Sequence, residues 1–224
     1  AKDKRGTVGM ISGCAMSVMF GRTNAATVKL LNAAGFDVVT PREQVCCGAL
    51  FAHSGRLDLA RKHARENVAV FGGRALDAIV INAAGCGSTL KEYGHLLGEE
   101  GKGFAGKVRD LTEFLVEQGF VRKKFRPWPG KVTYHDACHL AHPQRITKQP
   151  RELVKAVAGG SYVELAESDV CCGSAGTYNL TEPEMAARLR ERKVRNILAT
   201  EAETLVTTNP GCILQIQAGL DKAA

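Results

Sequence analysis

The chain has 224 residues, 45% of them hydrophobic and 24% charged, which is an ordinary composition for a soluble protein and enough for one large domain or two small ones. No apolar run reaches the roughly 18 residues of a membrane span, and the polar start lacks both an initiator methionine and a signal peptide, which suggests a piece of a longer protein. The net charge of +7 favours a solvated basic surface, or a docking face for an acidic partner, over nucleic-acid binding, because the basic residues are dispersed and aromatic residues make up only 6%.

The first half of the chain predicts strands that alternate with helices. Short β-rich or continuously apolar runs indicate strands, and apolar residues at helical spacing indicate amphipathic helices. We expect strands over 7–14, 36–41 and 77–86, and helices over 24–35 and 56–71.

The second half repeats this order after a basic, proline-containing stretch in the middle of the chain. Strands are expected over 131–138, 162–165 and 205–212, and helices over 150–159 and 182–200. The predicted organisation is a first module over 1–121, a linker over 122–130 and a second module over 131–224.

The eight cysteines follow the same duplication. Each half has one cysteine, then an adjacent pair followed by glycine, then a fourth cysteine, with spacings C-x31-CC-x38-C and C-x32-CC-x39-C. Equivalent cysteines are 124 to 126 positions apart, which scattered core thiols would not produce. The two sets are Cys14, Cys46, Cys47 and Cys86 in the first half, and Cys138, Cys171, Cys172 and Cys212 in the second.

These patterns predict an α/β fold of two repeated βα modules with mostly parallel sheets, related by a pseudo-two-fold axis. The single cysteines end predicted strands, and the CCG turns follow shorter strands. The carboxyl ends of parallel strands meet at one edge of the sheet, where ligands bind. We therefore expect four thiols to converge in each module, with Gly48 and Gly173 leaving room for a ligand.

Four converging thiolates suit an iron–sulfur cluster or a structural zinc ion, while buried free thiols are the alternative without a metal. Zinc sites usually use C-x-x-C pairs, which this chain lacks, and a roomier site favours a cluster. Adjacent cysteines are poorly placed for a disulfide, because their Cα atoms are only about 3.8 Å apart. They point apart and can reach two irons of one cluster.

Polar residues beside Cys138 have two interpretations. His135, His139 and His142 are candidates for a nitrogen ligand, a hydrogen-bond donor to sulfur or a proton carrier, although a structural role is favoured for each. The first half has no histidine at these places. Asp136 and Asp169 are expected to be turn residues or surface charges.

The doubled C…CCG…C pattern resembles the CCG, or cysteine-rich, domain shared by the cysteine-rich subunit of heterodisulfide reductase and iron–sulfur subunits of flavin-linked dehydrogenases. Four motifs in order are most similar to the glycolate oxidase (glycolate dehydrogenase) iron–sulfur subunit: NAAGCGSTLKEYG, YHDACHLAH, CCGSAGTYNL and NPGC. That subunit also has an N-terminal ferredoxin-like segment, which is not found here. The last cysteine of each half also lacks the C-x-x-C partner of heterodisulfide reductase.

The resemblance implies that all eight cysteines are metal ligands for one or two iron–sulfur clusters of the 4Fe–4S type, with zinc as the alternative at one site. It implies an electron-transfer subunit of an oxidoreductase, partnered by a flavin-containing catalytic subunit and other subunits of a dehydrogenase complex. Electrons would pass toward a quinone or another acceptor, in the cytoplasm or at the inner face of the membrane with peripheral association. Three alternatives stay open: a lactate-utilisation-type iron–sulfur protein, a zinc-stabilised scaffold, and a thiol–disulfide reductase.

Overall fold

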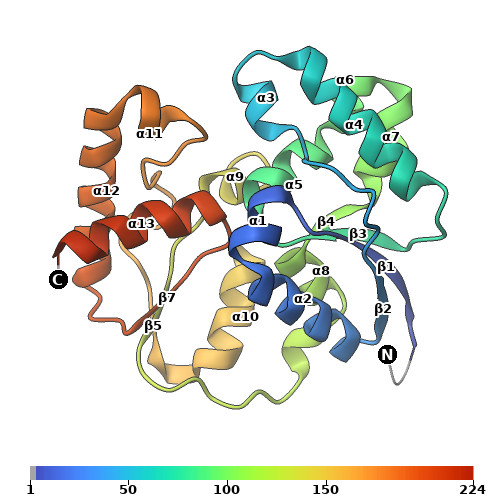
Figure 1. Ribbon diagram of the computed structural model, residues 1–224. Coiled ribbons are helices and arrows are strands. Elements are labelled where there is room, and N and C mark those ends of the chain that lie inside the picture. Colours follow the sequence, from blue (N-terminus) through green and yellow to red (C-terminus); the bar gives the residue numbers. More distant parts are fainter. Residues whose placement is uncertain (1–3, 224) are drawn as a thin grey trace. The chain divides into compact units, whose positions relative to one another are not determined.

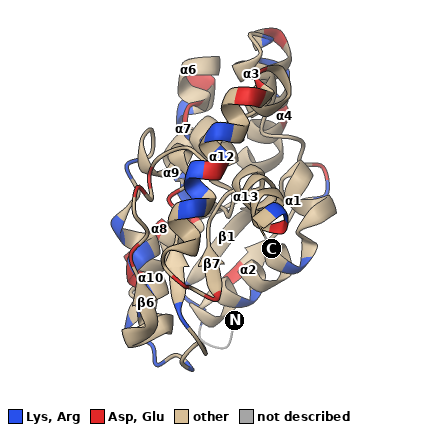
Figure 2. Cartoon of the chain, turned by 90° about the vertical axis from the view of Figure 1, so that its left-hand side faces the viewer, with Lys and Arg blue, Asp and Glu red and all other residues tan. Residues whose placement is uncertain are grey.

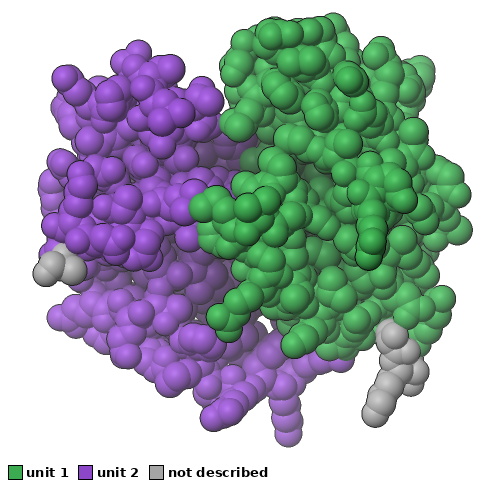
Figure 3. All heavy atoms as spheres, viewed as in Figure 1, with its two compact units in different colours: residues 1–120 green, residues 121–224 purple. Residues whose placement is uncertain are grey.

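A computed structural model describes residues 4–223. The chain divides into two compact units, Ala1–Phe120 (unit 1) and Val121–Ala224 (unit 2), which Figure 3 colours separately. Within the described range, no helix is long and apolar enough to cross a membrane.

Unit 1 is built on a four-stranded parallel sheet with the order β2-β1-β3-β4 (Figure 1). Its strands are β1 (Gly6–Ile11), β2 (Phe36–Val39), β3 (Ala78–Ile81) and β4 (Val108–Asp110). The central strand β1 pairs with β2 on one side and β3 on the other. All four residues of β3 are buried, because helices cover both faces of the sheet.

The helices of unit 1 connect these strands and supply the rest of its core. They are α1 (Cys14–Met19), α2 (Gly21–Ala33), α3 (Ala49–His53), α4 (Leu57–Gly72), α5 (Ala84–Lys91), α6 (Tyr93–Leu97), α7 (Glu99–Lys107) and α8 (Leu111–Glu117). In Figure 1, α2 and α8 lie on one side of the sheet, and α4 and α7 lie on the other. Phe71 of α4 and Phe104 of α7 pack edge to face, with ring centroids 6.0 Å apart.

Unit 2 has a smaller parallel sheet with the order β6-β5-β7. The strands are β5 (Val132–Tyr134), β6 (Tyr162–Val163) and β7 (Thr204–Val206). Its helices are α9 (Cys138–Ala141), α10 (Lys148–Ala158), α11 (Tyr178–Thr181), α12 (Pro183–Leu198) and α13 (Pro210–Ala223), with short 3-10 turns η1 (Phe120–Arg122) and η2 (Gly159–Ser161). Both units place their first strand at the centre of the sheet.

The segment between η1 and β5 has no helix or strand. Trp128, the one tryptophan of the chain, attaches this segment to unit 2. Its indole Nε1 donates to Thr204 Oγ1 at 3.1 Å, and its backbone N–H donates to Val157 O at 3.0 Å. An apolar cavity of about 150 Å³ lies beside the indole, between α10 and the sheet.

The expected α/β architecture, with one parallel sheet for each repeat, is confirmed. Several details differ from the sequence prediction, among them the strand expected over 36–41, which ends at Val39. β4 was not expected, and the strand expected over 162–165 ends at Val163. The strands before the single cysteines also end earlier, so that each of these cysteines lies in the first turn of the following helix.

Candidate metal centres

Three loops at the carboxyl edge of the sheet bring the cysteines of unit 1 together. Cys14 begins α1 just after β1, and Cys86 lies in the first turn of α5 just after β3. Cys46 and Cys47 lie in the loop between β2 and α3. Their burial increases from exposed Cys14, through partly buried Cys46 and Cys86, to buried Cys47. The group therefore extends from the surface into the core.

The thiols of unit 1 are close enough to affect one another. Cys14 Sγ lies 3.6 Å from Cys46 Sγ, and Cys47 interacts with both Cys46 and Cys86. The hydrogen bond to Cys46, followed by burial, raises the pKa of Cys14 well above its ordinary value. Neighbouring thiolates repel one another, so the fully ionised set is stable only with a cation among them.

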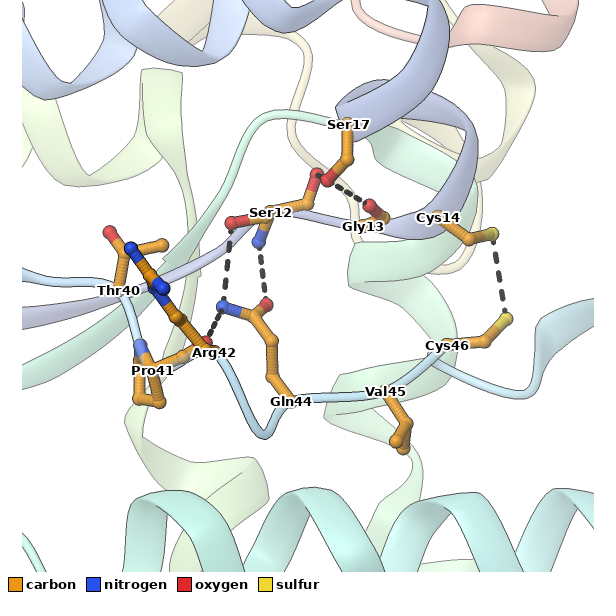
Figure 4. Close-up of a pocket in the computed structure, with 10 residues that line it drawn as sticks. All are labelled: Ser12, Gly13, Cys14, Ser17, Thr40, Pro41, Arg42, Gln44, Val45 and Cys46. Atoms are coloured by element: carbon orange, nitrogen blue, oxygen red, sulfur yellow. Dashed lines mark hydrogen bonds between the residues drawn. The ribbon is translucent and has the colours of Figure 1, made fainter.

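Gln44 fixes the distance between the first two cysteines of unit 1. Its Oε1 accepts from Ser12 N at 2.7 Å, and its Nε2 donates to Pro41 O at 2.8 Å (Figure 4). The amide thus joins the loop that carries Cys46 to the end of β1. A cavity of about 340 Å³ opens there, beside Cys14 and Cys46.

Asn67 and Tyr93 hold the CCG loop of unit 1 from the core side. The side chain of Asn67 accepts from Val45 N at 3.1 Å and donates to Cys46 O at 3.2 Å. Tyr93 Oη donates to Cys47 O at 2.9 Å. Both side chains are fully buried, and sequence analysis missed both. A polar residue on the buried face of a predicted helix was the available signal for Asn67.

The cysteines of unit 2 occupy the equivalent loops. Cys138 begins α9 after β5, and Cys212 lies in the first turn of α13 after β7. Cys171 and Cys172 lie in the loop between β6 and α11. Cys172 and Cys212 are buried, whereas Cys138 and Cys171 are partly buried.

Hydrogen bonds link these four thiols into one group. The bond between Cys138 and Cys171 lowers the pKa of Cys171 and raises that of Cys138. The bond with Cys172 lowers the pKa of Cys212, and His135 and Asn209 act in the same direction. Asn209 Nδ2 donates to Cys212 Sγ at 3.5 Å.

His135 is the histidine that faces the thiols of unit 2 most directly. One ring nitrogen and the sulfurs of Cys172 and Cys212 all lie within 4.8 Å of one another. The ring is 1% exposed, and its buried Nδ1 has no hydrogen-bond partner. Of the other two candidates, His139 Nδ1 lies 3.6 Å from Cys138 Sγ, and His142 Nε2 lies 3.3 Å from Asp169 O.

Two buried charges behind the cysteines of unit 2 were not anticipated. Asp136, expected to be a turn residue or a surface charge, is instead buried in a two-pronged ion pair with Arg151, at 2.8 and 2.5 Å. Lys193 of α12 is 1% exposed, and its ammonium donates to the carbonyls of Glu167 and Ser168. The expectation failed for Asp136 because its arginine partner lies 15 residues further along the chain, on α10, and nothing in the local pattern indicates that the two side chains meet.

The glycine of each CCG motif packs against a helix, α4 in unit 1 and α12 in unit 2, and leaves little space for a side chain. Gly48 has φ of 84° and Gly173 has φ of 90°, in the left-handed region that favours glycine. A Cβ on Gly48 would lie 3.3 Å from the backbone of Ala60, and a Cβ on Gly173 would lie 2.4 Å from Ala186 O. These contacts give both glycines a packing role, and the expected role, room for a ligand, stays a prediction.

The donor set in each unit fits a metal–thiolate group. Four thiols approach one another at the carboxyl edge of a parallel sheet, and backbone N–H groups of Gly48 and Gly173 point at Cys46 Sγ and Cys171 Sγ, at 3.5 and 3.3 Å. Sulfur ligands of this kind suit iron–sulfur clusters and zinc, and the imidazole of His135 adds one ring nitrogen to the donor set of unit 2.

The fold and the two thiol groups define a duplicated, cysteine-rich α/β protein. Comparison with known families agrees with this class. The family described as "Cysteine-rich domain" (CCG) matches residues 8–91 and 132–217, one match in each unit. The chain belongs to this family.

Three relatives show how the family resemblance extends along the chain. The chain is 42% identical to the "Probable glycolate oxidase iron-sulfur subunit" of Bacillus subtilis, over 96% of this chain and 50% of that protein. It is 34% identical to the "Glycolate oxidase iron-sulfur subunit" of Escherichia coli, over 91% and 52%. It is 29% identical to "Lactate utilization protein A" of Oceanobacillus iheyensis, over 93% and 87%.

These likenesses confirm the resemblance to glycolate oxidase iron–sulfur subunits. The chain is homologous to iron–sulfur subunits of oxidoreductases. It spans about half the length of the first curated relatives that it matches.

Proposed function

We propose that this chain binds iron–sulfur clusters and transfers electrons within a complex that oxidises glycolate or a similar 2-hydroxy acid. The convergence of four thiols in each unit carries the proposal. A relative named as a glycolate oxidase iron–sulfur subunit, matched along 96% of this chain, supports the substrate class.

All eight cysteines are the proposed ligands, in one set of four for each module, and we propose modules over 1–121 and 131–224 joined by the linker 122–130. A bound cluster, of the 4Fe–4S type with four thiolates, accepts and releases single electrons. The chain's own residues hold and tune the sulfurs. Gln44, Asn67 and Tyr93 fix the loops of unit 1, and Asn209 donates to Cys212 Sγ in unit 2.

The oxidation of the hydroxy acid belongs, in this proposal, to a flavin-containing subunit. That subunit would deliver electrons to the clusters, and a quinone or another acceptor would remove them, in the cytoplasm or at the inner face of the membrane. The test is to add glycolate to the complete anaerobic complex, with the flavin subunit and the full-length iron–sulfur subunit. Reduced-cluster EPR signals should appear with glycolate, and their absence while the flavin is reduced would contradict the proposed route.

The metal itself is tested on the anaerobically purified chain by its iron, sulfide and zinc content together with its EPR spectrum. We expect about four irons and four sulfides for each loaded unit. The variants C47S and C172S control for each other, since each should remove metal from its own unit only. Stoichiometric zinc without iron in both units would overturn the electron-transfer role.

Two specific observations favour second candidates. The chain is 29% identical to a relative named "Lactate utilization protein A" over 93% of this chain, which supports lactate as a second candidate substrate, and lactate should then reduce the clusters of the complex where glycolate does not. The imidazole beside two thiols in unit 2 is also a donor set suited to zinc. A zinc scaffold predicts zinc that C172S removes, and no reducible signal from unit 2.

A further inference from the structure

The helices α4 and α12 occupy the same place in the two units. Each has 16 residues, and their first residues are 126 positions apart, the same offset that separates Cys86 from Cys212. Each passes behind the CCG glycine of its unit at an equivalent alanine, Ala60 or Ala186. Residues 126 positions apart on these helices can therefore be compared directly.

Asn67 and Lys193 are such a pair, and both side chains donate hydrogen bonds to backbone carbonyls of the loop before the CCG glycine. Asn67 is 0% exposed and donates to the carbonyls of Val45 and Cys46, at 3.4 and 3.2 Å. Lys193 donates to the carbonyls of Glu167 and, at 3.2 Å, Ser168. Both side chains hold the segment that leads into the paired cysteines, but only one of them carries a charge.

The charge of Lys193 lies in the neighbourhood of the unit 2 thiols. Burial lowers the pKa of Lys193 overall, and the charges of Cys172, Asp169, Glu167 and Asp136 offset part of that decrease. Two backbone carbonyls accept from the ammonium, which favours its charged form. Asp136 and Glu167 have their own arginine partners, Arg151 and Arg192, so these carboxylates only partly offset the lysine. Figure 2 shows further basic residues along α12.

A second pair of equivalent positions also differs in polarity between the two units. Cys14 and Cys138 are 124 residues apart, and at the same offset Ile11 in unit 1 corresponds to His135 in unit 2. Ile11 is a buried aliphatic side chain, whereas His135 places an imidazole beside Cys172 and Cys212. Both replacements put a basic side chain near the thiols of unit 2, where unit 1 has a neutral amide and a hydrocarbon.

We propose that Lys193 raises the reduction potential of the metal–thiolate group in unit 2 above that of its counterpart in unit 1. Reduction adds one negative charge to the group, and a buried cation stabilises the reduced form more than the oxidised form. An electron delivered by a reduced flavin or a chemical reductant then resides in unit 2 at equilibrium. This inference rests on the proposed function, because it needs a redox-active group bound to the cysteines.

The test is a redox titration of the anaerobic, full chain followed by EPR, comparing wild type with K193Q, K193R and R195Q. C14S and C138S assign the signals to unit 1 and unit 2. Glutamine keeps a donor for the two carbonyls and removes the charge, arginine keeps the charge, and Arg195 is an exposed cation on the same helix. K193Q should lower the equilibrium constant for reduction of unit 2 at least tenfold, which is about 59 mV for one electron. The potential of unit 1 in K193Q, and the potentials of both units in R195Q, should stay at their wild-type values. An unchanged potential in K193Q with intact iron content would overturn the proposal.

Two further measurements decide the remaining cases. If K193Q does not fold, the C14S and C138S chains compare the two units directly, and a unit 2 potential equal to or below that of unit 1 would overturn the inference. If wild type holds zinc without iron, the proposed function fails. The effect of the Lys193 charge is then tested by chelator competition. K193Q should lose the zinc of unit 2 to the chelator at least tenfold more readily than wild type does, and equal zinc retention in the two proteins would contradict an effect of the charge.

Discussion

Gly173 meets two separate structural demands at one residue. Its φ of 90° disfavours any side chain, and a Cβ would lie 2.4 Å from Ala186 O of α12. Backbone oxygen cannot move aside without displacing the helix, so relief of this contact would shift the loop of Cys171 and Cys172. The glycine therefore connects the position of a helix to the position of two thiols.

We expect Gly173→Ala to lower the free energy of unfolding of unit 2 by about 2–4 kcal/mol, since strain at positive φ adds to the close contact. Gly159→Ala gives a comparison without a contact, because Gly159 has φ of 58° and ψ of −133° but a Cβ added there would meet nothing within 4 Å. Urea unfolding followed by Trp128 fluorescence measures both. A loss below about 1 kcal/mol in Gly173→Ala would contradict the combined effect of strain and contact.

The buried ion pair between Asp136 and Arg151 is a second feature for which a single substitution should strongly lower the stability of unit 2. Arg151→Met leaves a buried carboxylate without its partner, so we expect a loss of about 3–5 kcal/mol in the stability of unit 2. Arg192→Met breaks the exposed pair with Glu167 and should cost much less. Urea titrations of the two variants give the comparison, and similar midpoints would contradict it.

At the scale of elements, α8 depends on a cap whose acid is buried. Asp110 is 1% exposed, and its Oδ1 accepts from Thr112 N at 2.8 Å. Glu113 completes a capping box by accepting from Asp110 N at 3.1 Å. The cap satisfies N–H groups at the start of the helix, and it sits at the end of β4, the strand that the sequence did not reveal.

Burial raises the pKa of Asp110 above its ordinary value of 3.8. The folded protein then keeps a proton that the unfolded chain has lost, so this contribution to stability is present below pH 3.8 and decreases as the pH rises through the folded pKa. Asn caps helices as well as Asp, so D110N should remove only this pH dependence. Denaturant titrations from pH 4 to pH 7 should show the stability of wild type falling relative to D110N, and a constant difference would refute the shift.

At the scale of the whole molecule, the two units have separate sheets, separate thiol groups and one spectroscopic reporter. Trp128 is hydrogen-bonded to α10 and β7 of unit 2, so its fluorescence reports that unit. Far-UV circular dichroism reports the helices of both units. The two probes can therefore separate events that a single probe would average.

Metal removal should shift these probes differently. A metal that binds only the folded unit at 100 times its Kd stabilises that unit by about 2.7 kcal/mol. We expect C138S to lower the fluorescence midpoint in urea, whereas C14S leaves this midpoint near the wild-type value and changes the circular dichroism alone. Equal shifts of the fluorescence midpoint in both variants would mean that the units do not unfold separately.

The sequence predicted the parts of this fold that depend on local pattern. The spacing of the cysteines, the amphipathic helices and the continuously apolar β3 are all local or periodic signals. It did not reveal β4, which has only three residues, or the roles of Tyr93, Arg151 and Lys193. Those roles depend on which side chains from distant helices reach the same loop, and such long-range contacts leave no periodic trace in the chain.

The way in which α4 and α12 hold their loops has a consequence for how two copies of a module diverge. Asn67 and Lys193 contact backbone carbonyls, which every residue possesses, so the loop places no demand on the charge of the side chain that holds it. After a duplication, one copy can exchange an amide for an ammonium while the cysteines keep their places. The shape of the site is inherited through the main chain, and its electrostatic character is free to change one substitution at a time.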